Sequence, residues 1–360
     1  MVMGRRPEVQ TAPLSLAVFA MTGLTAQMLN ALASLPFRRP WQGPGSSLHN
    51  IGVAVSRTTV RAFLGYVTSL PTQEFRSVEM AIDDICRVIL PPFVARLGAT
   101  MEETRIAEVP GLYYRPRDRE SRGTILYLHG GGYIGTSPSM YAAFNAQLVH
   151  ETGCELFVPD YRLAPEFPFP ASLVDVVSVY EDLLRRGTAP ARLFVAGDSG
   201  GGGLVSALIL EALDRHLPSP AGLLLFSPEV SLALNEPSIT ENADVDILPW
   251  NIPVRPYLQG VDVHDSRLSP INADLRQFPP TLVAFGRDEM FRDGIRRFVA
   301  RLEECAVEVT AIEEPSMFHV FPLVMPWADA SLRVYRAVGD FVKRRLVQSD
   351  ATAPREPFPT

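Results

Sequence analysis

The chain has 360 residues, 47% hydrophobic and 20% charged, a composition that excludes a disordered protein and suits one large domain or two modest ones. Its formal net charge of −7 argues against nucleic acid as the main partner. The three cysteines, Cys86, Cys154 and Cys305, form no C-x-x-C pair, so neither a disulfide framework nor a zinc site is expected.

An uncharged apolar stretch runs from Pro13 to Pro36, after Arg5-Arg6. Three interpretations compete: a secretory signal cleaved near Ala31-Leu32-Ala33, a membrane-spanning helix, and an amphipathic helix lying on the protein or on a membrane surface. The polar residues inside the stretch favour the amphipathic helix. It would pack through a mainly apolar stripe made of Leu14, Val18, Met21, Thr25, Met28 and Leu32.

A glycine- and proline-rich linker at 41–47 separates this stretch from two helical patterns, at about 50–68 and 77–97. Residues 1–100 are therefore interpreted as an N-terminal extension and cap helices. Two short strands are expected next, around 104–108 and 111–115, with Pro110-Gly111 as the turn between them.

From position 124 onward apolar strands alternate with helices, which indicates an α/β fold with a mostly parallel central sheet covered by helices on both faces. Strands are expected at 124–128, 155–158, 192–196, 222–226, 281–285 and 307–312, and helices at 139–152, 171–186, 199–215, 290–304 and 327–346. The interval at about 229–279 breaks this alternation and is interpreted as a cap insertion in a catalytic domain of residues 101–346. Residues 347–360 are expected to form a flexible tail.

The strand at 192–196 leads into Gly197-Asp198-Ser199-Gly200-Gly201, which fits the pattern G-x-S-x-G. A strand that turns sharply into a helix places a serine at the corner, and the glycines allow the strained backbone and the approach of a substrate. A serine hydroxyl becomes a good nucleophile when a base takes its proton and a third group orients the base. Ser199 is therefore the candidate nucleophile.

Three histidines follow Ser199, and His319 is the candidate base because it lies just after the last strand. His216 and His264 are expected to be exposed, at a helix end and in an acidic loop. The acid that orients the base should follow the preceding strand, where Asp288 comes first. We expect Glu289 to point elsewhere.

Backbone N–H groups are also needed to stabilise the oxyanion of a tetrahedral intermediate. His129-Gly130-Gly131-Gly132-Tyr133 follows the strand at 124–128 and matches the glycine-rich loop that supplies such donors in lipases and esterases. His129 is interpreted as an anchor that hydrogen-bonds this loop.

In residues 75–346 the chain resembles the bacterial hormone-sensitive-lipase-like esterases, which are α/β-hydrolases with a cap. The resemblance rests on His129 to Tyr133, on Asp160 to Glu166, on Gly197 to Gly201 and on the Asp288/His319 pair. It implies ester hydrolysis through an acyl-enzyme without a metal or organic cofactor, and implies that Gly131, Gly132 and Gly200 supply the oxyanion N–H groups. The pocket would include Tyr133, where the family more often has phenylalanine or tryptophan, and Asp198.

The leading prediction is a cytoplasmic carboxylic-ester hydrolase acting on short to medium acyl esters. Alternatives are lactone or amide hydrolysis by the same triad, a membrane-associated lipase, and a ligand-binding protein, against which the presence of His319 argues. The expected partner is a small-molecule ester. A membrane surface contacted through residues 13–36 and a second copy of the chain in a homodimer are further candidates, and no nucleic acid is expected.

Overall fold

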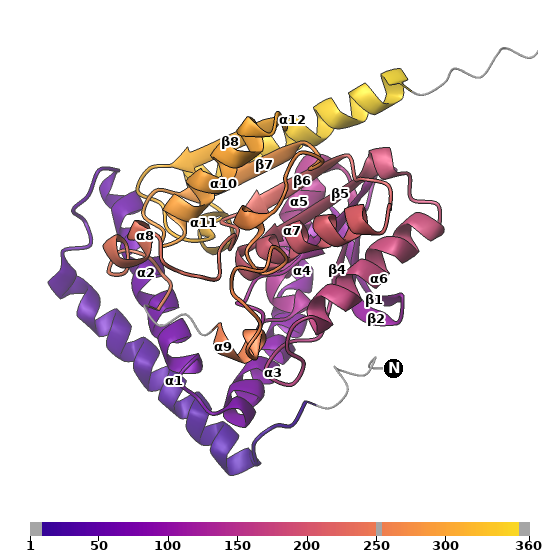
Figure 1. Ribbon diagram of the computed structural model, residues 1–360. Coiled ribbons are helices and arrows are strands. Elements are labelled where there is room, and N and C mark those ends of the chain that lie inside the picture. The colour runs from indigo at the N-terminus through magenta and orange to yellow at the C-terminus, as the bar shows by residue number, and fades with distance from the viewer. Residues whose placement is uncertain (1–8, 250–253, 353–360) are drawn as a thin grey trace, which may run out of the picture.

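The fold is seen in a computed structural model that describes residues 9–249 and 254–352 (Figure 1). Within these residues eight strands form one sheet in the order β1-β2-β4-β3-β5-β6-β7-β8. The β1–β2 and β2–β4 pairs are antiparallel, and every other pair is parallel. The strands are β1 Ala99–Ile106, β2 Val109–Pro116, β3 Thr124–Leu128, β4 Glu155–Pro159, β5 Leu193–Asp198, β6 Gly222–Phe226, β7 Thr281–Gly286 and β8 Val309–Glu314.

Helices cover both faces of this sheet, which confirms the predicted α/β class. One face packs on α5 and α12, and the other on α6, α7 and α10. The helices are α1 Leu14–Ser34, α2 Ser47–Val67, α3 Thr72–Ile89, α4 Pro91–Arg96, α5 Ala142–Thr152, α6 Ala171–Arg185, α7 Ser199–Asp214, α8 Pro237–Glu241, α9 Arg255–Leu258, α10 Arg292–Glu304, α11 Phe321–Val324 and α12 Asp329–Thr352. Short 3-10 turns are η1 Leu35–Arg38, η2 Pro138–Tyr141, η3 Pro190–Arg192 and η4 Pro270–Asn272.

The central strands read as continuous apolar runs because both of their faces are buried. In β5, Leu193 and Val195 pack with the α6, α7 and α10 layer, whereas Phe194 and Ala196 pack with α5 and α12. This alternation follows from the two-residue period of a strand. The parallel strands all end at one edge, so the loops that follow β3, β5, β6, β7 and β8 meet there.

The N-terminal helices α1, α2 and α3 lie together beside the sheet (Figure 1), and we refer to these three helices as the cap. Arg76 on α3 links the cap to the rest of the protein. Its side chain is buried, with only 1% of its surface exposed. Its guanidinium binds the carboxylate of Glu166 at 2.6 Å and donates to the carbonyl oxygens of Ile134 and Ala164, both at 2.8 Å. A buried cation with this many acceptors is well compensated for its lost hydration.

Two local predictions were wrong. The turn between β1 and β2 is made by Ala107 and Glu108, with φ of 50° and 64°, rather than by Pro110-Gly111, because both strands extend further than their apolar residues suggest. Helix α12 continues through Thr352, past the predicted start of the tail at 347. The remainder of that tail lies outside the described residues.

The apolar stretch near the N-terminus does form a helix, α1, and its packed side includes Met21 and Met28 of the predicted stripe, whereas Leu14, Val18, Thr25 and Leu32 are exposed. Ala20 and Leu24 are the buried residues of α1 and pack against Val67 and Val78 of α2 and α3. Leu14 and Val18 are 82% and 56% exposed. The segment Leu14–Arg38 is long and apolar enough to cross a membrane, properties that signal sequences share.

Candidate active site

Ser199 stands at the junction of β5 and α7, with a φ of 51° that a residue with a side chain rarely adopts. The turn is tight because α7 starts against the end of β3. A Cβ on Gly201 would lie 2.1 Å from the carbonyl oxygen of Leu128, so only glycine fits there. A strained backbone conformation persists where the surrounding structure enforces it. Here the strained turn places Ser199 at the start of a helix.

The loop after β3 brings backbone donors to the same place. Gly131 and Gly132 have φ of 113° and 60°, and a Cβ on Gly132 would meet no atom within 4 Å. A Cβ on Gly200 would lie 3.4 Å from the backbone nitrogen of Gly132, so the two segments are adjacent. N–H groups of this loop and of the α7 N-terminus can therefore converge on an oxygen bound beside Ser199.

His129 lies inside this loop, as an anchoring role requires. Its Nδ1 is 2.9 Å from both the carbonyl oxygen of Gly130 and Oγ1 of Thr136. Its ring stacks on Tyr161 with centroids 4.4 Å apart, and the Tyr161 hydroxyl donates to the carbonyl oxygen of His129. The histidine therefore fixes the loop from within.

The two residues expected in the substrate pocket are placed differently. Asp198 lines the cavity, but its carboxylate accepts hydrogen bonds from Tyr127, Tyr141 and the N–H of Gly130 at 2.7–3.0 Å. Burial raises the pKa of Asp198 to about 6. Tyr133 is 4% exposed and stacks on Tyr257, with ring centroids 4.0 Å apart. It is not among the described residues that line the cavity, so its assignment to the pocket is corrected: its ring belongs to the core.

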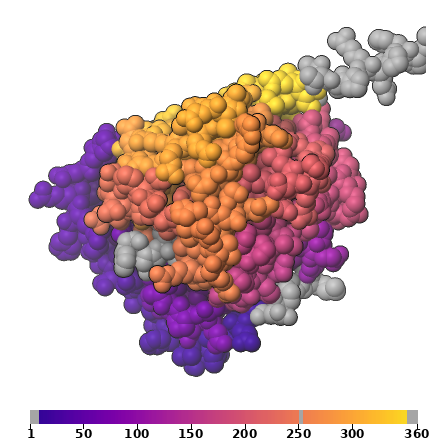
Figure 2. Space-filling model, in the orientation of Figure 1, coloured from indigo at the N-terminus to yellow at the C-terminus, as the bar shows by residue number. Residues whose placement is uncertain are grey.

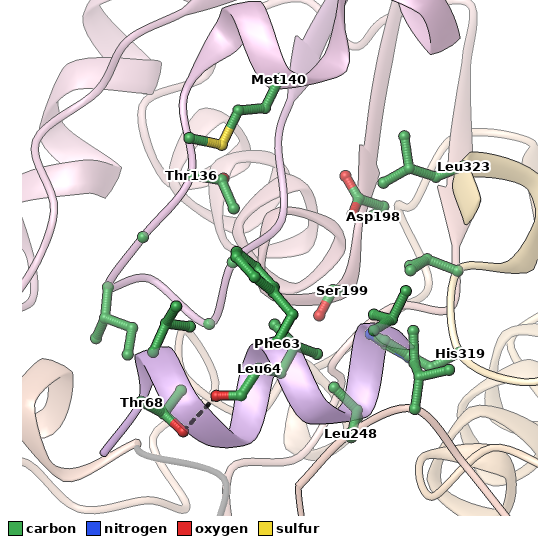
Figure 3. A pocket seen from close by; sticks show the side chains of 18 of the residues that line it. Phe63, Leu64, Thr68, Thr136, Met140, Asp198, Ser199, Leu248, His319 and Leu323 are labelled. Carbon is green, nitrogen blue, oxygen red and sulfur yellow. Dashed lines mark hydrogen bonds between the residues drawn. The ribbon is translucent and has the colours of Figure 1, made fainter. Parts of the chain in front are cut away.

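His319 follows β8 and points into the cavity that also contains Ser199 (Figure 3). The edge-on ring of Phe291, 5.1 Å from the imidazole centroid, packs against it. Burial lowers the pKa of His319, since the charged imidazole would lose its hydration. Nε2 of His319 has no hydrogen-bond partner in the described parts of the chain. Catalytic hydrogen bonds are often long without substrate and tighten on binding.

The acid beside His319 is Glu289, and the prediction of Asp288 is corrected. Oε2 of Glu289 lies 3.7 Å from Nδ1 of His319, and the glutamate is fully buried. Asp288 is turned to the other side of the loop, where its side chain is 30% exposed and its Oδ2 binds Arg57 of α2 at 2.7 Å. Adjacent residues in this turn point to opposite sides, so only one of the two carboxylates can reach the imidazole.

Sequence reasoning missed Asp246, which lies in the 229–279 interval. Its Oδ1 accepts from the backbone N–H of His319 at 2.9 Å, and its Oδ2 accepts from that of Met290 at 2.7 Å. Asp246 thereby joins the loop of the base to the loop of the acid. Arg57 was also missed: besides Asp288 it reaches the carbonyl oxygen of Ser316 and lies over the ring of Phe318. No local motif marks either residue.

The cavity that holds Ser199 and His319 has a volume of about 390 Å³. Its walls come from the body and from the cap, and Figure 3 shows Phe63 and Leu64 of α2 facing Ser199 across it. The 229–279 interval contributes Ile247, Leu248 and Pro249. A concave apolar space with few polar groups is typical of a small-molecule site.

Comparisons with known proteins agree with this geometry. A model of a family described as alpha/beta hydrolase fold matches residues 125–323. An acetyl-hydrolase of Streptomyces hygroscopicus is 34% identical over 235 residues, which are 64% of this chain and 78% of that protein. The carboxylesterase NlhH of Mycobacterium tuberculosis is 33% identical over 235 residues, 60% of this chain and 73% of that protein. Among solved structures, an esterase from the bacterial hormone-sensitive lipase family superposes with a TM-score of 0.74 at 25% identity, covering 85% of this chain and 100% of that one.

The chain therefore belongs to the alpha/beta hydrolase fold family. Within it, the chain is an esterase of the bacterial hormone-sensitive-lipase-like type, so the predictions of the fold and of the enzyme class are confirmed. These relatives are an acetyl-hydrolase, an esterase and a carboxylesterase, and they do not favour lactone or amide hydrolysis.

Proposed function

We propose that Ser199 is the nucleophile, His319 the general base and Glu289 the acid that orients it. His319 takes the hydroxyl proton of Ser199 at Nε2 as the oxygen attacks the ester carbonyl. The backbone N–H groups of Gly131, Gly132 and Gly200 are the donors for the resulting oxyanion. The observation that carries this proposal is the shared cavity of Ser199 and His319, with the glycine-rich loop beside it.

Collapse of the tetrahedral intermediate breaks the bond to the alcohol, which leaves with the proton held by His319. The acyl group then remains on Ser199 as an ester. A water molecule gives a proton to His319, attacks the acyl carbon and releases the carboxylic acid, while Ser199 regains its proton. Glu289 stabilises the imidazolium in both halves of the reaction and keeps Nδ1 as the donor side of the ring.

The substrates that fit are esters with short to medium acyl chains. A cavity of about 390 Å³ with mostly apolar walls favours small hydrophobic groups. We expect the purified protein to hydrolyse p-nitrophenyl acetate, butyrate and hexanoate, and EDTA to leave the rate unchanged, because the triad needs no metal. The Ser199→Ala protein serves as the blank for spontaneous hydrolysis. Activity that EDTA abolishes and zinc restores would contradict the mechanism.

For the N-terminal region we propose peripheral contact of α1 with a membrane surface, in a protein otherwise located in the cytoplasm. The outer side of α1 carries Leu14, Phe19 and Leu29, which are 82%, 77% and 63% exposed. This segment forms the lower left of the molecule in Figures 1 and 2, away from the sheet that Figure 1 shows. An exposed apolar helix face can bury itself at the lipid interface.

The membrane proposal predicts that Phe19→Ser combined with Leu29→Ser weakens co-sedimentation with lipid vesicles severalfold. Hydrolysis of a soluble ester should persist, because α1 does not line the cavity within the described residues. Val174→Ser, which alters a half-exposed valine on α6, is the matched control. Equal vesicle binding by all three proteins would contradict the proposal. A mature chain beginning at Ser34 in the native host would show that the stretch is instead a cleaved signal.

A further inference from the structure

The cavity contains a buried carboxyl group that the proposed triad does not use. Glu229 follows β6, and its backbone N–H donates to the carbonyl oxygen of Ser199 at 2.9 Å. The residue lines the same cavity as Ser199 and His319 and is 1% exposed. Neither of its carboxyl oxygens has a hydrogen-bond partner in the described residues. Buried polar groups are usually paired, so this exception needs a cause.

The other acidic side chains of the cavity wall are already paired. Asp198 accepts its three hydrogen bonds from the tyrosines and the glycine-rich loop. Glu79 forms an ion pair with Arg76 at 2.7 Å. Glu229 differs from both because no hydrogen bond from residues 9–249 or 254–352 offsets the desolvation of its carboxyl group. A polar side chain retained at such a cost is best explained by a partner that arrives with the substrate.

The surroundings of Glu229 favour a neutral partner. Burial raises the pKa of Glu229 to about 8, so the group is mostly protonated at neutral pH and can both donate and accept a hydrogen bond. Most described residues of the cavity wall are aliphatic or aromatic, and lysine and arginine are absent from them. A cation would lose its hydration in such a space, whereas a hydroxyl group loses much less.

We propose that Glu229 binds a hydroxyl group of the substrate, so that the enzyme prefers esters that carry a hydroxyl on the acyl chain or on the alcohol. This inference rests on the proposed function, because it requires an ester held at Ser199. A hydroxyl group can accept a hydrogen bond from the protonated carboxyl group and can donate one to it. An unsubstituted chain of the same length would leave the carboxyl unpaired, and a site built for a hydroxyl discriminates against such an analogue.

Two pairs of substrates distinguish the two positions of the hydroxyl. For the acyl side, p-nitrophenyl 3-hydroxybutyrate is compared with p-nitrophenyl butyrate. For the alcohol side, glycerol 1-monobutyrate is compared with propyl butyrate. In one of the two pairs we expect kcat/KM of the wild-type enzyme to favour the hydroxylated ester roughly tenfold.

Two substitutions of Glu229 test whether it is the source of this preference. Glu229→Leu should bring the ratio of the two kcat/KM values to about one or below, because leucine offers no hydrogen bond. Glu229→Gln should retain part of the ratio, because an amide also donates and accepts. Glu229→Leu should also keep or raise Tm, since it removes an unpaired buried carboxyl. A lower Tm in Glu229→Leu would show an internal contact of the carboxyl and contradict the proposal.

The outcomes separate this inference from the function on which it rests. If wild type and both variants hydrolyse the esters with the same ratios in both pairs, Glu229 has no role in selection, while the esterase assignment stands. If wild type hydrolyses none of the four esters, the proposed function itself fails. A preference for butyrylcholine over propyl butyrate that Glu229→Leu abolishes would show that the site binds a cation, and would overturn the hydroxyl proposal.

Discussion

Replacing Ser199 by alanine is expected to lower kcat for p-nitrophenyl butyrate by about 10⁵- to 10⁶-fold. The substitution removes the nucleophile but leaves the turn between β5 and α7, the glycine-rich loop and the cavity in place. Binding and the oxyanion donors would then supply the residual rate, as they do when a triad is dismantled. The loss of kcat is measured with the purified protein, after the rate of spontaneous hydrolysis in buffer has been subtracted.

His319→Ala should reduce kcat by a similar factor, and the double variant should be little worse than either single one, because the two groups act as a unit. His216→Ala and His264→Ala are matched controls, since both histidines are exposed. Near-full activity in His319→Ala, or a multiplicative loss in the double variant, would show that another group is the base.

Glu289→Gln is expected to lower kcat by about 10⁴-fold, because an amide cannot stabilise the imidazolium and favours the wrong tautomer of His319. Asp288→Asn should have a far smaller effect. Its carboxylate binds Arg57 rather than the imidazole, at a site where both side chains are partly exposed. Measuring kcat of Glu289→Gln and of Asp288→Asn under the same conditions shows which carboxylate orients His319. A larger loss in Asp288→Asn would return the acid role to that residue.

The pH profile gives a second measurement of the same assignment. Burial raises the pKa of Glu289 to about 8 and lowers that of His319. The active form needs an ionised Glu289 and a neutral His319, so loss of protons from the pair increases the rate. We expect kcat/KM to rise at least about tenfold from pH 6.5 to 8.5. If kcat/KM were constant from pH 6.5 to 8.5 and rose instead near pH 4 to 5, the Glu289 carboxylate would be ionised over the whole interval from 6.5 to 8.5, and this prediction would be wrong.

The sequence by itself determined the class of fold and the positions of the residues that we propose as nucleophile and base. These features have local causes. Buried parallel strands require continuous apolar runs, the helices between them require a 3.6-residue period, and the turn at Ser199 requires glycine at its flanks. The order of the motifs along the chain then placed His319 after the last strand, at the edge where Ser199 stands.

The tertiary structure decided what depends on distant partners. Asp288 and Glu289 are adjacent and chemically alike, and their roles separate because Arg57, 231 positions away, binds the first. Asp246 holds the backbone of His319 across 73 positions with no motif of its own. The packed side of α1 and the burial of the Glu229 carboxyl, which has no partner among the residues that the structure describes, likewise follow from contacts between elements far apart in the chain. Local patterns fix which element forms, whereas the direction of a side chain at its end is set by what packs against it.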